Sequence, residues 1–311
     1  FANTEVDIDH WVMKLSKVVR AISNKLTSSN YISKSKRNVA HHYDLSDKLY
    51  DLFLDPDRQY SCAYFNSPND TLEQAQINKK ELISKKLLLE ENQSVLDIGC
   101  GWGGMASHIY KKSNANVVGV TLSEEQIAYA QQRKVREKLD KVEYRLQDYR
   151  NVNEKYDRIV SVGMFEHVGR KRYKEYYDKC FDLLKNDGVM LIHTIGTNTR
   201  EWSQNSFINK YIFPEGELPH IQDLTHKFID NWNLEDWQNF GLSYAKTLKS
   251  WYTNIGDWKG IEHYDQRFRR MWNFYLLGCA ANFNSRGICL WQIVYTKRNS
   301  NRNDDSHYIR N

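Results

Sequence analysis

Val95-Leu-Asp-Ile-Gly-Cys-Gly-Trp-Gly-Gly104 is the stretch that decides the fold class of this chain of 311 residues. A short apolar strand leads to Asp97, and the chain then breaks at Gly99, Gly101 and Gly103. Glycine allows positive φ and close approach to a ligand, because no Cβ stands in the way. A loop of this kind, after the first strand of a doubly wound sheet, is where nucleotide-like cofactors bind. The stretch therefore predicts an α/β protein whose cofactor contacts Asp97 and these glycines.

The sequence around this loop alternates between strands and helices, which is typical of a parallel sheet. Short apolar runs predict strands at Ser94–Ile98, Asn116–Val120, Val142–Leu146, Asp157–Val162 and Gly188–Thr194. Helical spacing predicts helices at Thr71–Leu89, Gly103–Lys112, Ser123–Leu139, Tyr173–Lys185, Tyr244–Tyr252 and Ile261–Phe283. Leu234–Phe240 is expected as a sixth strand, and Ile288–Lys297 is expected to close the sheet as its last strand. The predicted fold class is thus a doubly wound Rossmann-like sheet with helical insertions and a partial N-terminal helical segment.

Three segments follow from the distribution of charge and hydrophobicity. Residues 1–37 form a basic N-terminal segment with an amphipathic helix at Trp11–Leu26 and a linker. Such a helix can lie on an anionic membrane surface or pack on the main domain with its basic face in solvent. Residues 38–297 are expected to form the main domain, whose polar and aromatic beginning we interpret as a lid over the glycine loop. Residues 298–311 are a polar tail.

The composition narrows the class of protein. No apolar run approaches the roughly 18 residues of a membrane span, and the acidic start of the chain does not read as a signal peptide. The five cysteines form no Cys-x-x-Cys pair, which favours a reducing compartment and argues against structural zinc. The pair His41-His42 lacks a companion ligand motif, so no metal site is predicted. The net charge of +5 permits an anionic partner, such as phospholipid or nucleic acid.

Several sequence blocks outside the glycine loop resemble a single family. They are His42–Ser46, Gln59–Tyr64, Gly119–Ser123, Gly163–Gly169, Leu191–Gly196, Tyr244–Leu248 and Gly278–Ala280. With the glycine loop, which is similar to motif I of S-adenosylmethionine (SAM) methyltransferases, they resemble the cyclopropane-fatty-acyl-phospholipid synthases and the related mycolic acid cyclopropane synthases. Ser285–Gly287 and Leu290–Val294 look like the bacterial phospholipid branch. The N-terminal segment resembles the end of the extra N-terminal domain of bacterial members.

The resemblance implies methylene transfer from SAM to the cis double bond of an unsaturated acyl chain in a membrane phospholipid, which forms a cyclopropane ring. In this family bound bicarbonate is the base that takes a proton from the new methyl group. The expected enzyme is cytoplasmic and peripheral on the inner face of the cytoplasmic membrane. It has no nucleic-acid partner, and the missing N-terminal part could carry a homodimer contact.

Three other functions compete with this one. A SAM-dependent lipid methyltransferase of the same family would give a methyl-branched or methylene product. A nucleic-acid or small-molecule methyltransferase is a hypothesis of another class, but Gly163–Glu166 stands where an Asn/Asp-Pro-Pro-Tyr motif would be expected. A non-catalytic membrane-binding protein is disfavoured because Glu166, His193 and Tyr244 are all present.

For the cofactor, the resemblance assigns Thr121, Leu122 and Gln126. It also assigns Tyr60 and Ser61, which would close over the cofactor from the lid.

Three polar residues near these positions have competing interpretations. Asp148 and Tyr149 follow the third expected strand, where methyltransferases commonly contact adenine. A strand-end Asp is also often only a turn residue, so both interpretations stay open. Ser123 we interpret as a helix cap, because it begins a capping-box pattern.

Bicarbonate needs donors for its charged oxygens and one acceptor for its hydroxyl. The resemblance gives the acceptor role to Glu166 and the donor roles to His193 and Tyr244. Backbone groups at Cys62 and Ile195 would complete the set in this family. Glu166 follows the fourth expected strand and His193 lies near the end of the fifth, so both should project at the carboxyl edge of the sheet, where α/β sites lie. A direct acid–base pair of Glu166 and His193 without an anion is the alternative.

Cys279 is a further position of the family, sometimes taken as an active-site residue. A thiol in an apolar helix is more often a small core group, and the alkylation needs no covalent nucleophile. The acyl chain should enter an apolar tunnel. Candidate aromatic linings are Tyr64, Phe65, Phe165, Phe207, Tyr211, Phe213 and Trp251.

Overall fold

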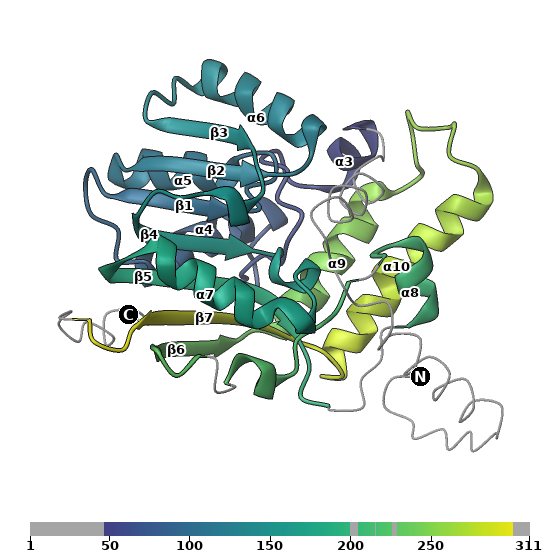
Figure 1. Cartoon of the computed structure of the whole chain (residues 1–311). Coiled ribbons are helices and arrows are strands. Elements are labelled where there is room, and N and C mark those ends of the chain that lie inside the picture. Colours follow the sequence, from purple (N-terminus) through teal and green to yellow (C-terminus); the bar gives the residue numbers. More distant parts are fainter. Residues whose placement is uncertain (1–46, 200–204, 215, 226–228, 301–311) are drawn as a thin grey trace.

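A seven-stranded mixed sheet organises the part of the chain that the computed structural model describes, which is residues 47–199, 205–214, 216–225 and 229–300 (Figure 1). The strands are β1 (Ser94–Ile98), β2 (Asn116–Thr121), β3 (Val142–Leu146), β4 (Tyr156–Val162), β5 (Leu184–Gly196), β6 (Trp232–Asn239) and β7 (Cys289–Lys297). Their order across the sheet is β3-β2-β1-β4-β5-β7-β6. The strands from β3 to β5 are parallel, whereas β7 is antiparallel to both β5 and β6. The predicted α/β fold class is confirmed.

Helices cover both faces of the sheet and its carboxyl end (Figure 1). They are α3 (Asp47–Phe53), α4 (Leu72–Lys86), α5 (Gly104–Ser113), α6 (Glu124–Glu137), α7 (Tyr173–Leu183), α8 (Ser206–Tyr211), α9 (Gly241–Ile255) and α10 (Gln266–Asn284). Side chains of α4, α5 and α6 pack on the face that holds Val95, and those of α7 pack on the face that holds Leu96. Successive residues of β1 therefore enter two different cores, as expected for a strand buried on both faces.

The remaining helices build the side of the molecule where the strands end. In Figure 1, α3, α8, α9 and α10 lie beyond the carboxyl ends of the parallel strands. Their apolar side chains form a third core, in which Phe53 of α3 contacts both Trp251 of α9 and Trp272 of α10. In a parallel sheet this edge is where ligand sites form. The aromatic layer is therefore placed to enclose such a site.

The expectation that the last strand closes the sheet at its edge is wrong. β7 lies between β5 and β6, so β6 forms the edge. Every residue of β7 is buried, whereas three successive residues of β6 are exposed. A strand buried along its whole length needs neighbours on both sides, because its N–H and C=O groups must be paired. The bounds predicted for β1 and β3 are confirmed, while β5 is longer than expected at both ends.

Some predictions fall outside the described residues. These are the helix at Trp11–Leu26, the pair His41-His42, the first part of the lid and the end of the polar tail. Within the described ranges, no helix is both long and apolar enough to cross a membrane.

Candidate functional site

The loop after β1 has the conformation that its glycines predict. Gly99, Gly101 and Gly103 all have positive φ, between 54° and 83°. A Cβ on Gly99 would lie 2.9 Å from the Cβ and Cγ atoms of Met164. A Cβ on Gly103 would lie 2.5 Å from the hydroxyl oxygen of Tyr144, which donates a hydrogen bond to Gly103 O. Both positions therefore require glycine for conformation and for space.

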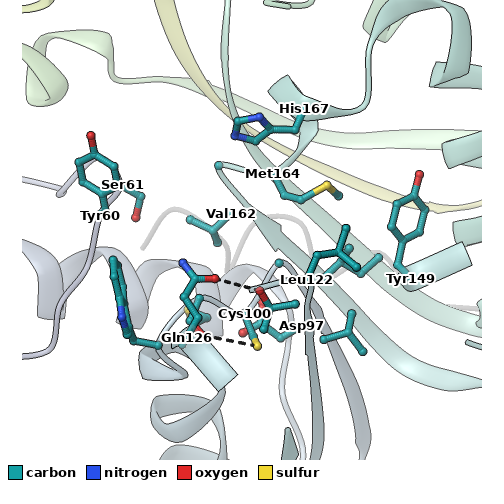
Figure 2. Close-up of a pocket in the computed structure, with 18 of the residues that line it drawn as sticks. Tyr60, Ser61, Asp97, Cys100, Leu122, Gln126, Tyr149, Val162, Met164 and His167 are labelled. Carbon is teal, nitrogen blue, oxygen red and sulfur yellow. Dashed lines mark hydrogen bonds between the residues drawn. The ribbon is translucent and has the colours of Figure 1, made fainter. Parts of the chain in front are cut away.

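A first cavity opens above this loop, between the carboxyl ends of β1, β2 and β4 and the lid (Figure 2). It is lined by ten of the eleven residues predicted to bind the cofactor, namely Tyr60, Ser61, Asp97, Gly99, Gly101, Thr121, Leu122, Gln126, Asp148 and Tyr149. Gly103 is not part of the lining, and its glycine is explained by the approach of Tyr144. Figure 2 shows Tyr60 and Ser61 entering from the lid, across the cavity from Leu122.

Asp97 is a buried acidic residue of this cavity. Its side chain is 1% exposed, and its Oδ2 has no hydrogen-bond partner among the described residues. Burial raises the pKa of Asp97 to about 7, although the cation of Lys79 opposes the shift. An unpartnered carboxylate oxygen at a cavity is satisfied when a ligand brings a donor or a positive charge. The site thus fits a cationic group, such as the amino group or the sulfonium of SAM.

The side chains at the end of β2 are ordered by hydrogen bonds. Thr121 Oγ1 donates to Gln126 Oε1 over 2.9 Å, which holds the Gln126 amide beside Gly101. Ser123 accepts from Gln126 N and does not line the cavity, so its interpretation as a helix cap is confirmed.

Asp148, which follows β3, fits both interpretations left open by the sequence, a turn residue and a residue of the cofactor site. It caps a short 3-10 helix, η1 (Tyr149–Asn151), and also lines the cavity. Its two oxygens bind the guanidinium of Arg150 at 2.9 and 2.6 Å. Arg150 lines the same cavity, so the carboxylate of Asp148 is already paired with a cation there.

Two side chains of α4 that no sequence motif marks hold the lid in place by hydrogen bonds. Lys79 of α4 is fully buried and donates 2.8 Å hydrogen bonds to Gln59 Oε1 and Ser61 Oγ. Gln76 donates to the carbonyls of Gln59 and Ser61. Burial lowers the pKa of Lys79 to about 8, and Asp55 acts against this shift. The conformation of Ser61 at the cavity therefore depends on a buried cation one layer away.

Replacing Lys79 by Met is expected to weaken cofactor binding about tenfold, because Gln59 and Ser61 lose their shared donor and each buried acceptor left unpaired costs about 1–3 kcal/mol. Calorimetric titration with S-adenosylhomocysteine measures this. Lys85→Met, on the exposed side of the same helix, should leave affinity unchanged. Equal affinities in the two variants would contradict the role of Lys79.

A second cavity adjoins the first, and all six candidate catalytic residues line it. These are Cys62, Glu166, His193, Ile195, Tyr244 and Cys279. Four residues, Tyr60, Ser61, Gly163 and His167, line both cavities and form the wall between them. The rest of the second lining is largely apolar and comes from α8, α9 and α10, from the segment that follows α8 and from the start of β7. A ligand in the first cavity and one in the second would therefore meet at this wall.

Glu166 lies in a short 3-10 helix, η2 (Phe165–His167), directly after β4. Its Oε1 accepts a 2.7 Å hydrogen bond from Ile195 N, while its Oε2 has no partner within the described part of the chain. Burial raises the pKa of Glu166 to about 7, and the bond from Ile195 N limits the shift. The Ile195 amide therefore orients Glu166 and is not free for a ligand.

His193 and Tyr244 supply the other polar groups of this cavity. His193 is 1% exposed and its Nε2 has no partner among the described residues, while its Nδ1 lies 3.2 Å from Gln292 Nε2. Burial lowers the pKa of His193 well below its ordinary value, so the ring is neutral. Burial likewise raises the pKa of Tyr244, which keeps its hydroxyl protonated. The cavity thus offers one unpartnered carboxylate oxygen and neutral donors.

The thiols of this cavity are protonated. Burial raises the pKa of Cys62 well above its ordinary value and that of Cys279 to about 12. The reactive form of cysteine is the thiolate. Neither group is therefore suited to act as a nucleophile, and Cys62 Sγ donates to Ala63 O.

The aromatic residues that line the second cavity differ from those expected to line the acyl tunnel. Phe213 lines the second cavity, whereas Phe165 and Trp251 are fully buried in the cores. Tyr275 and Phe283 of α10 line the cavity without having been candidates, and Tyr275 Oη lies 3.1 Å from Tyr60 Oη. Their i, i+8 spacing places both on one face of a helix, and this is the sequence signal that could have predicted them as lining residues.

The order of the sheet, the glycine loop after β1 and the cavity at the strand ends define the fold of the SAM-dependent methyltransferases. A model of the mycolic acid cyclopropane synthetase family matches residues 31–293. The chain therefore belongs to this family, and the resemblance seen in its sequence is confirmed.

Named relatives extend this result. A cyclopropane-fatty-acyl-phospholipid synthase of Escherichia coli (strain K12) is 46% identical over 258 residues, which cover 82% of this chain and 66% of the relative. The chain thus spans just under two thirds of that protein. A probable fatty acid methyltransferase of Pseudomonas putida is 37% identical over 283 residues, covering 88% of this chain and 72% of the relative. The structure of mycolic acid cyclopropane synthase CmaA1 complexed with SAH and CTAB matches with 36% identity and a TM-score of 0.79, covering 84% of this chain and 98% of that one.

Proposed function

We propose that this protein transfers a methylene group from SAM to the cis double bond of an unsaturated acyl chain in a membrane phospholipid, forming a cyclopropane ring. The observation that carries this proposal is the pair of cavities that share one wall. The first presents the glycine loop and the unpartnered carboxylate of Asp97, and the second is apolar with a polar set around Glu166. The name of the relative in Escherichia coli supports this reaction. The name of a relative in Mycobacterium tuberculosis, cyclopropane mycolic acid synthase 2, supports cyclopropane formation.

The first cavity would hold SAM, which supplies an electrophilic methyl group when bound. Asp97, the glycine loop and Gln126 would bind it, and Tyr60 and Ser61 would close over it. An alkene is a weak nucleophile, so the main contribution of these residues is to hold the methyl group in line with the double bond. The shared wall is the place where the two groups would meet.

The second cavity would hold the acyl chain at its double bond. Formation of the new C–C bond, with cleavage of the C–S bond of the cofactor, leaves a positive charge on the acyl chain. Aromatic faces stabilise such a charge through their quadrupole, and Tyr244 stacks on Phe283 at 4.6 Å within this lining. Loss of one proton from the new methyl group then provides the electron pair that closes the ring.

We propose bicarbonate as the base that takes this proton. Its hydroxyl would donate to Glu166 Oε2, and its charged oxygens would accept from His193 and Tyr244. Two atoms without a partner among the described residues, Glu166 Oε2 and His193 Nε2, support this assignment, since both residues line the second cavity. A buried polar atom without a partner calls for a ligand that satisfies it.

The lipid substrate leads us to propose further that the protein acts as a cytoplasmic, peripheral enzyme at the inner face of the cytoplasmic membrane. The net charge of +5 is compatible with an anionic lipid surface. No nucleic-acid partner is proposed, and the oligomer we propose is a homodimer.

The function is tested by incubating the protein with SAM and vesicles of unsaturated phospholipid, in the presence of bicarbonate. Mass spectrometry of the acyl chains should show the gain of one methylene unit, and NMR of the product should show a cyclopropane ring. The absence of any lipid product would contradict the proposal. A methyl-branched or methylene product would instead establish the second candidate function, which the name of the Pseudomonas putida relative favours.

The rate of ring formation is expected to fall as the pH decreases through about 7. Burial raises the pKa of Glu166 to about 7, and only the ionised carboxylate is an acceptor at both oxygens. Stability should have the opposite slope, because a raised folded pKa contributes stability at low pH that is lost as the pH rises through about 7. Single-turnover rates at saturating bicarbonate measure the first effect. A flat profile across neutral pH would contradict it.

A further inference from the structure

Gln292 of β7 stands opposite His193 of β5 in the antiparallel register of the two strands, which lie side by side in the sheet (Figure 1). The amide nitrogen of Gln292 lies 3.2 Å from His193 Nδ1. Both side chains are enclosed, with 0% and 1% exposure. The partner of His193 on this side is thus set by the pairing of two buried strands, not by a mobile loop.

The orientation of the Gln292 amide, with Nε2 and not Oε1 toward the ring, determines which ring nitrogen carries the proton. A neutral imidazole has one N–H donor and one bare acceptor nitrogen, whereas an amide nitrogen can only donate. His193 is neutral because burial lowers its pKa, and the cations of Lys79 and Lys86 act in the same direction. With Gln292 Nε2 donating to Nδ1, the ring proton resides on Nε2.

We infer that Gln292 is a positioning residue that holds His193 in the Nε2–H tautomer, so that His193 presents a donor and not a base to the second cavity. His193 lines that cavity, and its Nε2 has no partner among the described residues. The inference rests on the proposed function, and it separates two mechanisms that the sequence left open. A proton leaving the new methyl group cannot be accepted at His193 Nε2, so it goes to the bound anion.

The tautomer can be observed without any substrate. In protein labelled with ¹⁵N-histidine, two-dimensional ¹H–¹⁵N spectra distinguish a protonated ring nitrogen from a bare one. His193→Asn identifies the signals of this ring by their loss. The expected result in the unmodified protein is a bare Nδ1 and a protonated Nε2 at neutral pH. A protonated Nδ1 would overturn the inference, whatever the lipid assay gives.

Two substitutions test the link to turnover. Gln292→Met keeps the volume but removes the donor, so both tautomers should appear and kcat should fall at least tenfold, with KM for SAM unchanged. Gln292→Glu supplies only acceptors, so the ring proton should move to Nδ1 and kcat should fall further. It should also move the acid limb of the pH profile, because a carboxylate beside the ring raises its pKa. Neither variant is expected to restore normal turnover.

The matched control is Gln238→Met. Gln238 lies in the edge strand β6 and pairs with Gln292 on the side of β7 away from His193. Its substitution should leave the tautomer and kcat unchanged. Gln292→Met with unchanged kcat and an unchanged tautomer would overturn the inference. Failure of the vesicle assay with a protonated Nε2 would count against the proposed function alone and would support the tautomer assignment.

Discussion

Replacing Glu166 by Gln is expected to lower turnover by about 10²–10³, the size of effect seen when one preorganised electrostatic partner is removed. The variant keeps the shape of the side chain, and its amide oxygen can still accept from Ile195 N. The outer atom becomes an NH₂ group, which donates hydrogen bonds and cannot accept them. An anion whose hydroxyl needs an acceptor then loses it, and the base is no longer oriented.

Cofactor binding should survive this change, because Glu166 lines only the second cavity. Single-turnover formation of cyclopropane product and calorimetric titration with S-adenosylhomocysteine separate the two effects. Glu143→Gln is the matched control, since Glu143 is exposed and its carboxylate pairs with Arg145. A Glu166 variant that turns over at the normal rate would remove the bound anion from the mechanism.

Replacing Gly99 by Ala is expected to abolish useful cofactor binding and to destabilise the fold by about 2–5 kcal/mol, as a left-handed conformation with a side chain costs about 1–2 kcal/mol and overpacking adds about 1–3 kcal/mol. Gly99 has φ of 81°, and the new Cβ would meet Met164 at 2.9 Å. Met164 follows β4 and lines the first cavity. Relief of the clash must displace either the loop or this wall, and both shape the cofactor site.

Thermal unfolding and titration with S-adenosylhomocysteine measure the two parts of this prediction. Gly278→Ala is the control, because a Cβ there has no atom within 4 Å and the residue lies inside α10. Alanine favours a helix over glycine by about 1 kcal/mol, so the control should be slightly stabilised. Normal affinity in the Gly99 variant would show that the loop tolerates a side chain.

The strands next to the glycine loop were predictable because local signals mark their ends. β1 ends where Gly99 takes positive φ, and the capping residue Ser123 fixes the start of α6. The placement of β7 was not predictable. The sequence pattern predicts that this segment is a strand, but it does not indicate which strands are its neighbours. Its insertion between β5 and β6 depends on contacts between segments far apart in the chain.

The site residues were predictable where a polar side chain lies at the carboxyl end of a predicted strand. Glu166 and His193 follow that rule, and their side chains meet in one cavity. Lys79 and Gln292 were missed, because each acts through another residue from a different element. A lysine in a helix is ordinarily placed in solvent, and a glutamine in an alternating strand carries no sign of its partner. Such supporting contacts become visible only with tertiary structure.

The wall formed by Tyr60, Ser61, Gly163 and His167 has a thermodynamic consequence. Because these residues belong to both cavities, a ligand that holds them in its own binding geometry on one side changes the free energy of binding on the other side. Linkage then requires each ligand to raise the affinity for the other by the same factor. The enzyme would thus hold its methyl donor tightly when a lipid chain is in place and release the spent donor more readily once the chain has left.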